Sequence, residues 1–217
     1  MRILVLNPNT TASMTEKIGA AARRVASAET EIVAVNSANG PASIEGFYDE
    51  AMSLAGMLAV IRNTPDFDAV VIACFDDTGL DAARCLTDKP VIGIGEAAYH
   101  MASMISNKFS VVTTLARSVP ALEHNLHRYG LISRCARVRS SEVAVLDLEH
   151  PGSDACNRIS AEISRAISED RAEAIVLGCA GMADLADALA KEHGLPVLDG
   201  VVCAIGLAEA MVKLKLL

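Results

Sequence analysis

Two of the chain's six cysteines follow apolar segments that repeat one another. Segment 69–74 reads AVVIAC and segment 174–179 reads AIVLGC, so Cys74 and Cys179 occupy the same step of a repeat with an offset of 105 residues. Apolar runs without polar alternation are typical of parallel strands buried on both faces. Ligands of open parallel sheets bind at the carboxyl ends of the strands, so both thiols are expected at such an edge.

Two like thiols on opposite sides of one cleft suit the inversion of a carbon stereocentre that bears an acidic hydrogen. A thiolate removes the proton from one face, and the other cysteine's thiol delivers a proton to the opposite face. The roles exchange for the other enantiomer, and no cofactor is required. The ordinary pKa of cysteine is about 8.5, so a thiolate near neutral pH needs stabilisation. The backbone N–H groups of helices expected after Cys74 and Cys179 would supply it.

Two carboxylates follow the first of these cysteines directly. Asp76 and Asp77 would oppose formation of the Cys74 thiolate if their side chains pointed into the cleft. Asp is also a favoured residue at the start of a helix, where its side chain accepts hydrogen bonds from free N–H groups. We therefore expect at least one of the two to cap the helix that follows.

The elements that must position the cysteines alternate between β-branched runs and Ala-rich helical stretches. The alternation predicts right-handed βαβ units and parallel sheets. The strands are expected at 3–6, 31–35, 69–73, 91–94, 109–112, 137–145, 174–177 and 196–198. The helices are expected near 15–26, 45–62, 79–86, 96–106, 119–129, 154–168, 184–193 and 202–213.

The repeat extends beyond the two cysteine segments. With an offset of 106 residues, segment 90–92 (PVI) aligns with 196–198 (PVL), and segment 4–7 (LVLN) with 110–113 (SVVT). Four strands of the first half thus map onto four of the second in the same order. The sequence predicts an α/β fold of two pseudosymmetric lobes, each a four-stranded parallel sheet flanked by helices, with the active site in the cleft between them. Chance similarity between generic βαβ units is the competing explanation.

The alternative for the two thiols is that they are ordinary core cysteines, because free cysteine is often buried and inert. Their matched positions on strand-to-helix turns favour a functional role for this pair alone. The other four are expected inside helices (Cys85 and Cys203) or in and near loops (Cys135 and Cys156). No CxxC spacing occurs, and no third ligand accompanies His124 and His127, so no metal site is predicted.

Polar residues follow the strands at the same expected edge. Asn7, Thr113 and Thr114 could hydrogen-bond a ligand or cap the next helix, and the sequence leaves both roles open. The second strand leads into loop 36–46 (NSANGPASIEG), which is either a substrate loop or a solvated connection. Ser43 in this loop is also a candidate N-cap.

Composition excludes several function classes. The chain has 217 residues, of which 52% are hydrophobic, 21% charged and 3% aromatic, and its net charge is −8. Nucleic-acid binding needs a cationic surface, which this charge opposes. No apolar stretch reaches the roughly 20 residues of a membrane span, and the N-terminus lacks a signal-peptide pattern. We therefore expect a cytoplasmic protein whose six cysteines are thiols.

Several motifs together resemble the aspartate/glutamate/hydantoin racemase superfamily, and within it the hydantoin racemase branch. The resemblance covers nearly the whole chain, and the two cysteine motifs are its most specific part. The motifs are NPNTT (7–11), GPASIE (40–45), CFDD (74–77), GIGEA (93–97), VVTTL (111–115) and LGCAGM (177–182).

The resemblance implies a cofactor-independent racemase that binds a small molecule, holds no metal and assembles as a homo-oligomer. It implies Cys74 and Cys179 as the acid/base pair and a substrate held by the loops after the strands. It divides the chain into a first lobe (1–97 plus 205–217) and a second lobe (98–204), with the C-terminal helix returning to the first. The implied substrate-binding residues are Asn7, Ser43, Ile44, Phe75, Thr113, Thr114, Ala180, Gly181 and Met182.

The cysteine motifs differ from those of the superfamily's amino-acid racemases, which typically carry Cys-Asn-Thr and Cys-Thr-His. Here the stretches read CFD (74–76) and CAG (179–181), which favours an uncharged or weakly acidic ring over free aspartate or glutamate. The primary prediction is racemisation of 5-substituted hydantoins at C5. Allantoin, itself a 5-ureidohydantoin, is the nearest alternative. An amino-acid racemase, a malonate decarboxylase and a non-enzymatic small-molecule binding protein are less favoured.

Overall fold

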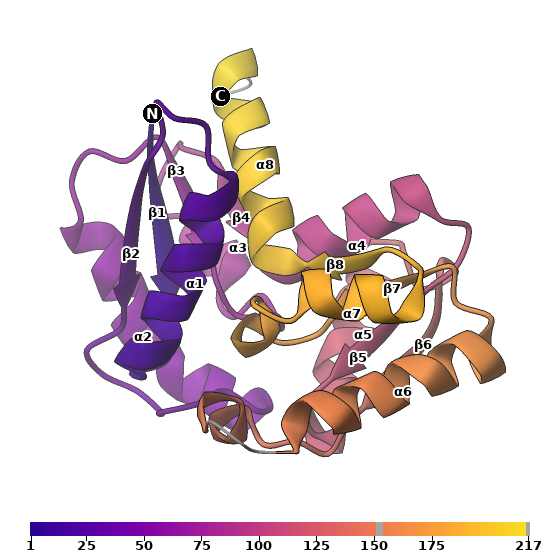
Figure 1. Ribbon diagram of the computed structural model, residues 1–217. Helices are drawn as coiled ribbons and strands as arrows, with labels where there is room; N and C mark the ends of the chain where they lie inside the picture. The colour runs from indigo at the N-terminus through magenta and orange to yellow at the C-terminus, as the bar shows by residue number, and fades with distance from the viewer. Residues whose placement is uncertain (151–153, 216–217) are drawn as a thin grey trace.

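Eight strands form two parallel sheets of four strands each, in the computed structural model of the chain (Figure 1). The structure describes residues 1–150 and 154–215. The first sheet has the order β2-β1-β3-β4, and the second has the equivalent order β6-β5-β7-β8. The strands are β1 (Arg2–Asn7), β2 (Glu31–Asn36), β3 (Ala69–Ile72), β4 (Val91–Gly93), β5 (Phe109–Thr113), β6 (Cys135–Ser140), β7 (Ala174–Leu177) and β8 (Val197–Asp199).

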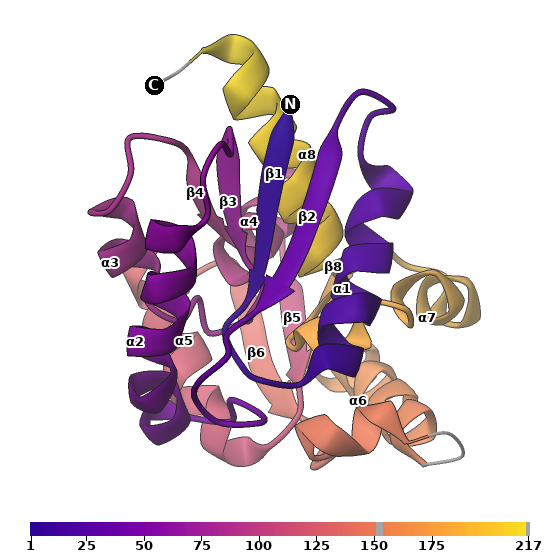
Figure 2. The same ribbon diagram turned by 90° about the vertical axis from the view of Figure 1, so that its left-hand side faces the viewer.

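Helices connect the strands and cover both faces of each sheet. They are α1 (Ala12–Val25), α2 (Phe47–Asn63), α3 (Leu80–Arg84), α4 (Ile94–Ile105), α5 (Val119–Arg128), α6 (Ala155–Asp170), α7 (Ala186–His193) and α8 (Gly200–Leu214). Short 3₁₀ helices are η1 (Ala116–Ser118), η2 (Val145–Glu149) and η3 (Ala180–Met182). Figure 2 shows the first sheet with α2 and α3 on one side and α1 and α8 on the other. No helix in the described part of the chain has the length and apolar character of a membrane span.

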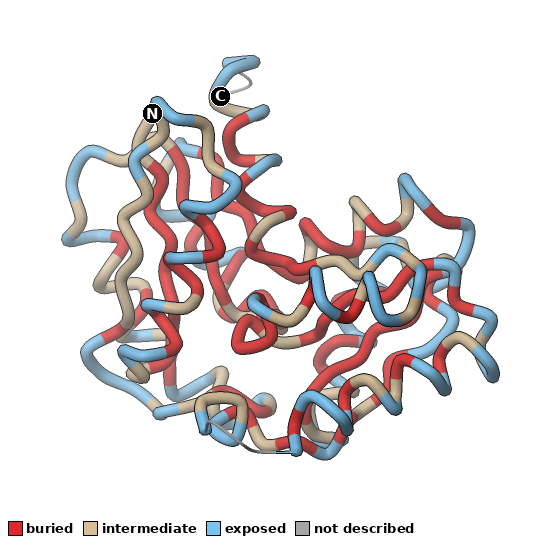
Figure 3. Tube along the Cα trace, viewed as in Figure 1, coloured by how far each residue is buried: buried red, intermediate tan, exposed pale blue. Residues whose placement is uncertain are grey.

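Alternate residues of each strand serve separate cores, as the two-residue period of a strand requires. In β1, Leu4 and Leu6 pack with α2 and α3, whereas Ile3 and Val5 face α1 and α8. All four side chains are fully buried, which explains why the strand sequence shows no polar alternation. In Figure 3 both sheets run through the interior of the molecule and exposed segments lie around them.

The two lobes are related by the repeat that the sequence predicts. In both, the final strand runs directly into a helix, β4 into α4 and β8 into α8, and these two helices pack against each other. Gly200 at the start of α8 meets Ile94 at the start of α4, where an added Cβ would lie 2.6 Å from the Ile94 carbonyl oxygen. The close approach of equivalent helix starts requires glycine at position 200 and marks the pseudo-twofold relation.

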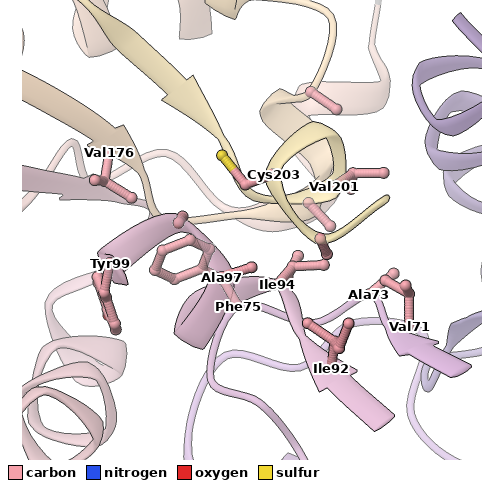
Figure 4. Packing of buried hydrophobic residues seen from close by; sticks show 14 of the residues in the cluster. Val71, Ala73, Phe75, Ile92, Ile94, Ala97, Tyr99, Val176, Val201 and Cys203 are labelled. Atoms are coloured by element: carbon pink, nitrogen blue, oxygen red, sulfur yellow. The ribbon is translucent and has the colours of Figure 1, made fainter. Parts of the chain in front are cut away.

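One buried cluster crosses from lobe to lobe. It joins alternate residues of both sheets to α4, α5 and α8. Within it, the ring of Tyr99 packs edge-on to Phe75 at 5.3 Å and stacks on Phe109 at 6.0 Å between ring centroids. Figure 4 shows Phe75 and Tyr99 in this packing, beneath the start of α8. The shared core fixes one lobe against the other and so fixes the cleft edge of both sheets.

The predicted strand 137–145 is wrong at both ends. Strand β6 starts at Cys135, which is therefore the first residue of the strand, next to the preceding loop, and the strand ends at Ser140. Its partner β5 ends at Thr113, and a backbone hydrogen bond from Ser141 N to Thr113 O at 2.9 Å extends the pairing by one residue. Glu142 then adopts a φ of 55°, which ends the extended backbone and leads the chain into η2.

Candidate active site

Cys74 and Cys179 lie just beyond the carboxyl ends of β3 and β7, at matching steps. The preceding residues are held in the same way in each lobe: Ala73 N donates to Leu6 O, and Gly178 N donates to Val112 O, both at 2.8 Å. Each cysteine is the second residue after its strand and directly follows the residue that donates this hydrogen bond. Both cysteines are partly accessible. The repeat therefore delivers two thiols to the same edge.

Both thiols line one cavity between the lobes. Its volume is about 40 Å³, which accommodates a few water molecules at roughly 10–15 Å³ each. Much of the wall is apolar, and the polar members are neutral apart from one carboxylate. The lining residues are Asn9, Met14, Ile44, Ala73, Cys74, Phe75, Asp76, Thr113, Thr114, Ser118, Leu122, Val145, Gly178, Cys179 and Ala180.

The sequence-predicted site residues divide into two groups. The two cysteines and Ile44, Phe75, Thr113, Thr114 and Ala180 line the cavity. Asn7, Ser43, Gly181 and Met182 lie outside its wall. Met182 is fully buried in the core of the second lobe, and Ser43 is a partly exposed residue of the loop before α2.

Asn7 positions a neighbour that does line the cavity. Its Nδ2 donates to Asn9 Oδ1 at 2.8 Å and to Thr15 Oγ1 at 3.0 Å, and its Oδ1 accepts from Asn9 N at 3.2 Å. These bonds fold the turn after β1 so that Asn9 reaches the cavity. Gly181 does not line the cavity, but its backbone N–H donates a hydrogen bond to the Cys179 sulfur.

Cys74 lies in an environment that favours its neutral thiol. Burial raises the pKa of this thiol, and the charge of the adjacent Asp76 carboxylate, which accepts a hydrogen bond from it, raises the pKa further. A hydrogen bond with Thr78 acts in the opposite direction. The Asp76 carboxylate also accepts hydrogen bonds from the Thr78 backbone N–H, at 3.2 Å, and from the Thr78 hydroxyl. Asp76 is thus the carboxylate that faces the cleft.

Asp77 turns away from the cleft and caps a helix, as expected for one of the two carboxylates. The helix is α4 and not α3, the helix that follows directly. Asp77 Oδ1 accepts from Gly95 N at 2.9 Å, and Oδ2 accepts from Glu96 N at 2.8 Å and from the Tyr129 hydroxyl at 2.6 Å. Burial raises the pKa of Asp77 to about 7, against these hydrogen bonds, which lower it.

The glycines of the GIGEA motif make room for this cap. An added Cβ at Gly93 would lie 2.1 Å from Asp77 Oδ1, and one at Gly95 would lie 2.4 Å from the Phe75 carbonyl oxygen. Neither distance is compatible with a side chain. The two glycines of the motif therefore allow the loop after β3, which carries Cys74, to pack against the start of α4.

Cys179 has different neighbours. Burial raises the pKa of its thiol to about 12, and the charges of Glu45 and Asp76 also raise it. The Gly181 backbone N–H and the Lys17 ammonium lower it. The loop after β7 supplies no carboxylate next to this sulfur, because Gly181 stands where the first loop has Asp76. The two thiols are equivalent in position and unlike in surroundings.

Two charged side chains of the first lobe hold the segment around η2 in the second lobe. Glu45, from the loop before α2, accepts from Val145 N at 2.9 Å and from the Arg117 guanidinium, and its carbonyl accepts from Ser118 Oγ at 3.0 Å. Lys17, on α1, donates to the Leu148 carbonyl at 3.2 Å and pairs with Glu149 at 3.1 Å. These contacts close the cavity on the side where Val145 lines it.

The sequence reasoning missed several lining residues. Met14, Ser118, Leu122 and Val145 come from segments with no local motif, and only the tertiary arrangement brings them to the cavity. Asn9 stands inside a motif already recognised, NPNTT, but only the geometry of the turn shows that Asn9, and not Asn7, lines the cavity. Within residues 1–150 and 154–215, no group of three or more His, Cys, Asp or Glu side chains is placed to hold a metal ion.

A pair of like α/β lobes with one cysteine from each in a shared cavity defines a class of two-lobed racemase-fold proteins. The family model described as Asp/Glu/Hydantoin racemase matches residues 3–208. The chain belongs to this family.

Individual relatives cover nearly its full length. The chain is 51% identical to a hydantoin racemase of Rhizobium meliloti, over 97% of this chain and 88% of the relative. It is 48% identical to a hydantoin racemase of Pseudomonas sp. (strain NS671), over 99% and 87%. Among solved structures, the allantoin racemase from Klebsiella pneumoniae superposes with a TM-score of 0.97 at 48% identity, over 99% of this chain and 89% of that one. Racemases of this kind are isomerases.

Proposed function

We propose that the chain interconverts the D and L enantiomers of 5-substituted hydantoins, with Cys74 and Cys179 as the two acid/base groups. The observation that carries this proposal is the placement of two thiols, from equivalent strand ends, in the wall of one cavity. Relatives at 48% and 51% identity that are named hydantoin racemases support the substrate class.

The reaction requires one thiolate and one thiol. The thiolate takes the C5 proton from one face of the hydantoin, and the electron pair left at C5 delocalises into the neighbouring ring carbonyl as an enolate. The second thiol then gives its proton to the opposite face. Since both thiols have raised pKa values, the resting pair is protonated, and the catalytically competent form carries one thiolate.

The cavity wall suits a neutral ring with an apolar substituent. Ile44, Phe75, Leu122 and Val145 offer apolar surface. We propose that Thr113, Thr114 and the backbone around Ala180 and Gly181 hold the ring carbonyls. The side chains of Ser43 and Met182 do not line the cavity, and we assign them supporting positions in the loops that do.

Allantoin is the second candidate substrate. Two solved structures of allantoin racemases, at 48% and 43% identity, superpose with TM-scores of 0.97 and 0.96. The polar wall residues Asn9 and Ser118 are the groups available to a ureido substituent. A substrate that benefits from them would favour allantoin over hydantoins with hydrocarbon substituents.

Three further assignments complete the proposal. The first lobe comprises residues 1–97 plus 205–217, and the second comprises residues 98–204. The packing of α8 on α1, α4 and β3 supports this division. Residues 216–217 lie outside the described part of the chain. The six free thiols support a cytoplasmic location. The exposed side chains of Phe47, Tyr48 and Met52 on α2 support a homo-oligomer.

The test uses single enantiomers of 5-benzylhydantoin, 5-isopropylhydantoin and allantoin, with aspartate and glutamate as controls, in deuterated water. A racemase exchanges the C5 hydrogen and abolishes optical rotation, whereas a binding protein does neither. Cys74→Ser and Cys179→Ser should each abolish racemisation, and each variant retains exchange of one enantiomer through the remaining thiol. Wild-type rates in both variants would overturn the two-thiol mechanism.

A further inference from the structure

Asp76 lines two neighbouring cavities. It lines the cysteine cavity, and it also lines a second groove of about 290 Å³ between α2, α3 and α5. The ionisable residues of this second groove, besides Asp76 and Asp77, are Glu50, Asp81, His124 and Arg128. Asp76 is partly accessible, as is Glu50. The carboxylate beside Cys74 is thus placed where the cysteine cavity and the second groove meet.

Glu50 is held in the groove in a state that can both take up and release a proton near neutral pH. Partial burial and the charge of Asp76 raise the pKa of Glu50 to about 7, while Arg128 lowers it. Arg128 is itself paired with Asp81, Nη1 to Oδ2 at 2.9 Å, and with the Tyr129 hydroxyl. The groups that shift the pKa of Cys179 are the Gly181 N–H and the charges of Glu45, Lys17 and Asp76.

A two-thiol racemisation leaves the enzyme in a different protonation state from the one in which it started. When Cys74 has taken the C5 proton and Cys179 has given one, Cys74 is a thiol and Cys179 a thiolate. A second turnover in the same direction requires Cys74 to lose a proton and Cys179 to gain one. Both changes require proton exchange with solvent.

We propose that Asp76 and Glu50, with water of the second groove, form the route by which Cys74 exchanges its proton with solvent between turnovers. This inference rests on the proposed function. The Cys74 S–H bond breaks as the proton passes to the Asp76 carboxylate. The proton moves through water to the Glu50 carboxylate and is then released, while Cys179 recovers a proton from water. Glu50 acts through Asp76 and never on the substrate, so it is a positioning residue.

The test compares Glu50→Gln, which keeps the side-chain shape, with Asp81→Asn, which removes one carboxylate charge from the same groove. Both variants are assayed in each direction near pH 7. In Glu50→Gln we expect kcat to fall roughly tenfold with kcat/KM unchanged, because the lost step follows product release. The loss is smaller than the about 10²–10⁴-fold cost of removing a group that transfers the substrate proton. Asp81→Asn should keep wild-type values, and millimolar imidazole should restore kcat in Glu50→Gln.

Isotope washout gives the decisive readout. Each C5-deuterated hydantoin enantiomer is incubated in ordinary water, and loss of deuterium from recovered substrate is measured. At equal extents of racemisation, Glu50→Gln should retain more deuterium in the enantiomer whose deuteron goes to Cys74 and leave retention in the other unchanged. An equal change for both enantiomers, or an unchanged kcat, would overturn the relay. Absence of solvent protium at C5 of the opposite enantiomer formed by the wild type would instead overturn the proposed function.

Discussion

The Glu45 carboxylate of the first lobe accepts the Val145 backbone N–H of the second lobe at 2.9 Å. Glu45 is nearly buried, at 7% exposure, and its other carboxylate oxygen takes the Arg117 guanidinium. Its neighbour Ile44 and its partner Val145 both line the cysteine cavity. One side chain therefore ties together two walls of the cavity that come from different lobes, about a hundred residues apart in the chain.

Glu45→Gln should weaken the contact between the two walls of the cavity. The amide retains one acceptor oxygen and turns an N–H₂ group toward a donor, so one buried donor is left without a partner at a cost of about 1–3 kcal/mol. We expect a lower free energy of unfolding in urea and a raised KM for hydantoins, because the cavity wall is less well defined. The exposed Glu16, on α1, provides a matched control as Glu16→Gln. Equal KM values in the two variants would contradict a role in the wall.

The pH dependence of racemisation should follow the raised pKa values of the thiols. One thiolate is required, and burial holds both thiols neutral above the ordinary cysteine pKa of about 8.5. The acidic limb of kcat/KM should therefore rise with pH into the range above 8.5. In Asp76→Asn the loss of the carboxylate charge lowers the pKa of Cys74, so this limb should move to lower pH. A shift to higher pH, or none, would contradict the placement of Asp76 beside the thiol.

Two tyrosines of the same core should respond oppositely to loss of their hydroxyls. The Tyr99 hydroxyl is fully buried and has no hydrogen-bond partner among the described residues, whereas the Tyr129 hydroxyl donates to Asp77 at 2.6 Å. Tyr99→Phe should leave the free energy of unfolding unchanged or raise it by up to about 1 kcal/mol, and Tyr129→Phe should lower it by about 1–3 kcal/mol. Thermal and urea unfolding of the two variants provide the measurement. A destabilised Tyr99→Phe would indicate a partner such as a bound water.

Two glycine-to-alanine substitutions should distinguish the effect of the Asp77 cap on stability and activity from the effect of helix propensity on stability. In Gly93→Ala the new Cβ would lie 2.1 Å from Asp77 Oδ1 and must displace the cap and the loop that carries Cys74. We expect loss of several kcal/mol of stability together with most of the racemase activity. Gly206→Ala, on the exposed side of α8 with no atom near its Cβ position, should instead stabilise by about 0.5–1 kcal/mol. Wild-type activity in Gly93→Ala would refute the cap's role.

The sequence was informative where local pattern determines structure. The repeat around Cys74 and Cys179 predicted the two sheets and the edge at which both thiols lie, because strand burial and chain order follow from the residues themselves. The wall residues Ser118 and Val145 were out of reach, since only the docking of the lobes brings them to the cavity. The sequence also predicted the wrong helix for the cap formed by an aspartate, for the same reason. Asp77 caps α4, which begins 17 residues later in the chain, at Ile94.

The matched hydrogen bonds of Ala73 and Gly178 have an evolutionary consequence. A half-length chain that paired with its own copy about the axis between α4 and α8 would already present one cysteine from each copy to a common cavity. Such a pairing suits racemisation, because a base and an acid are needed on opposite faces of one stereocentre. Within a single chain each half can change separately, and Asp76 beside one thiol with Gly181 at the matching step of the other is such a difference.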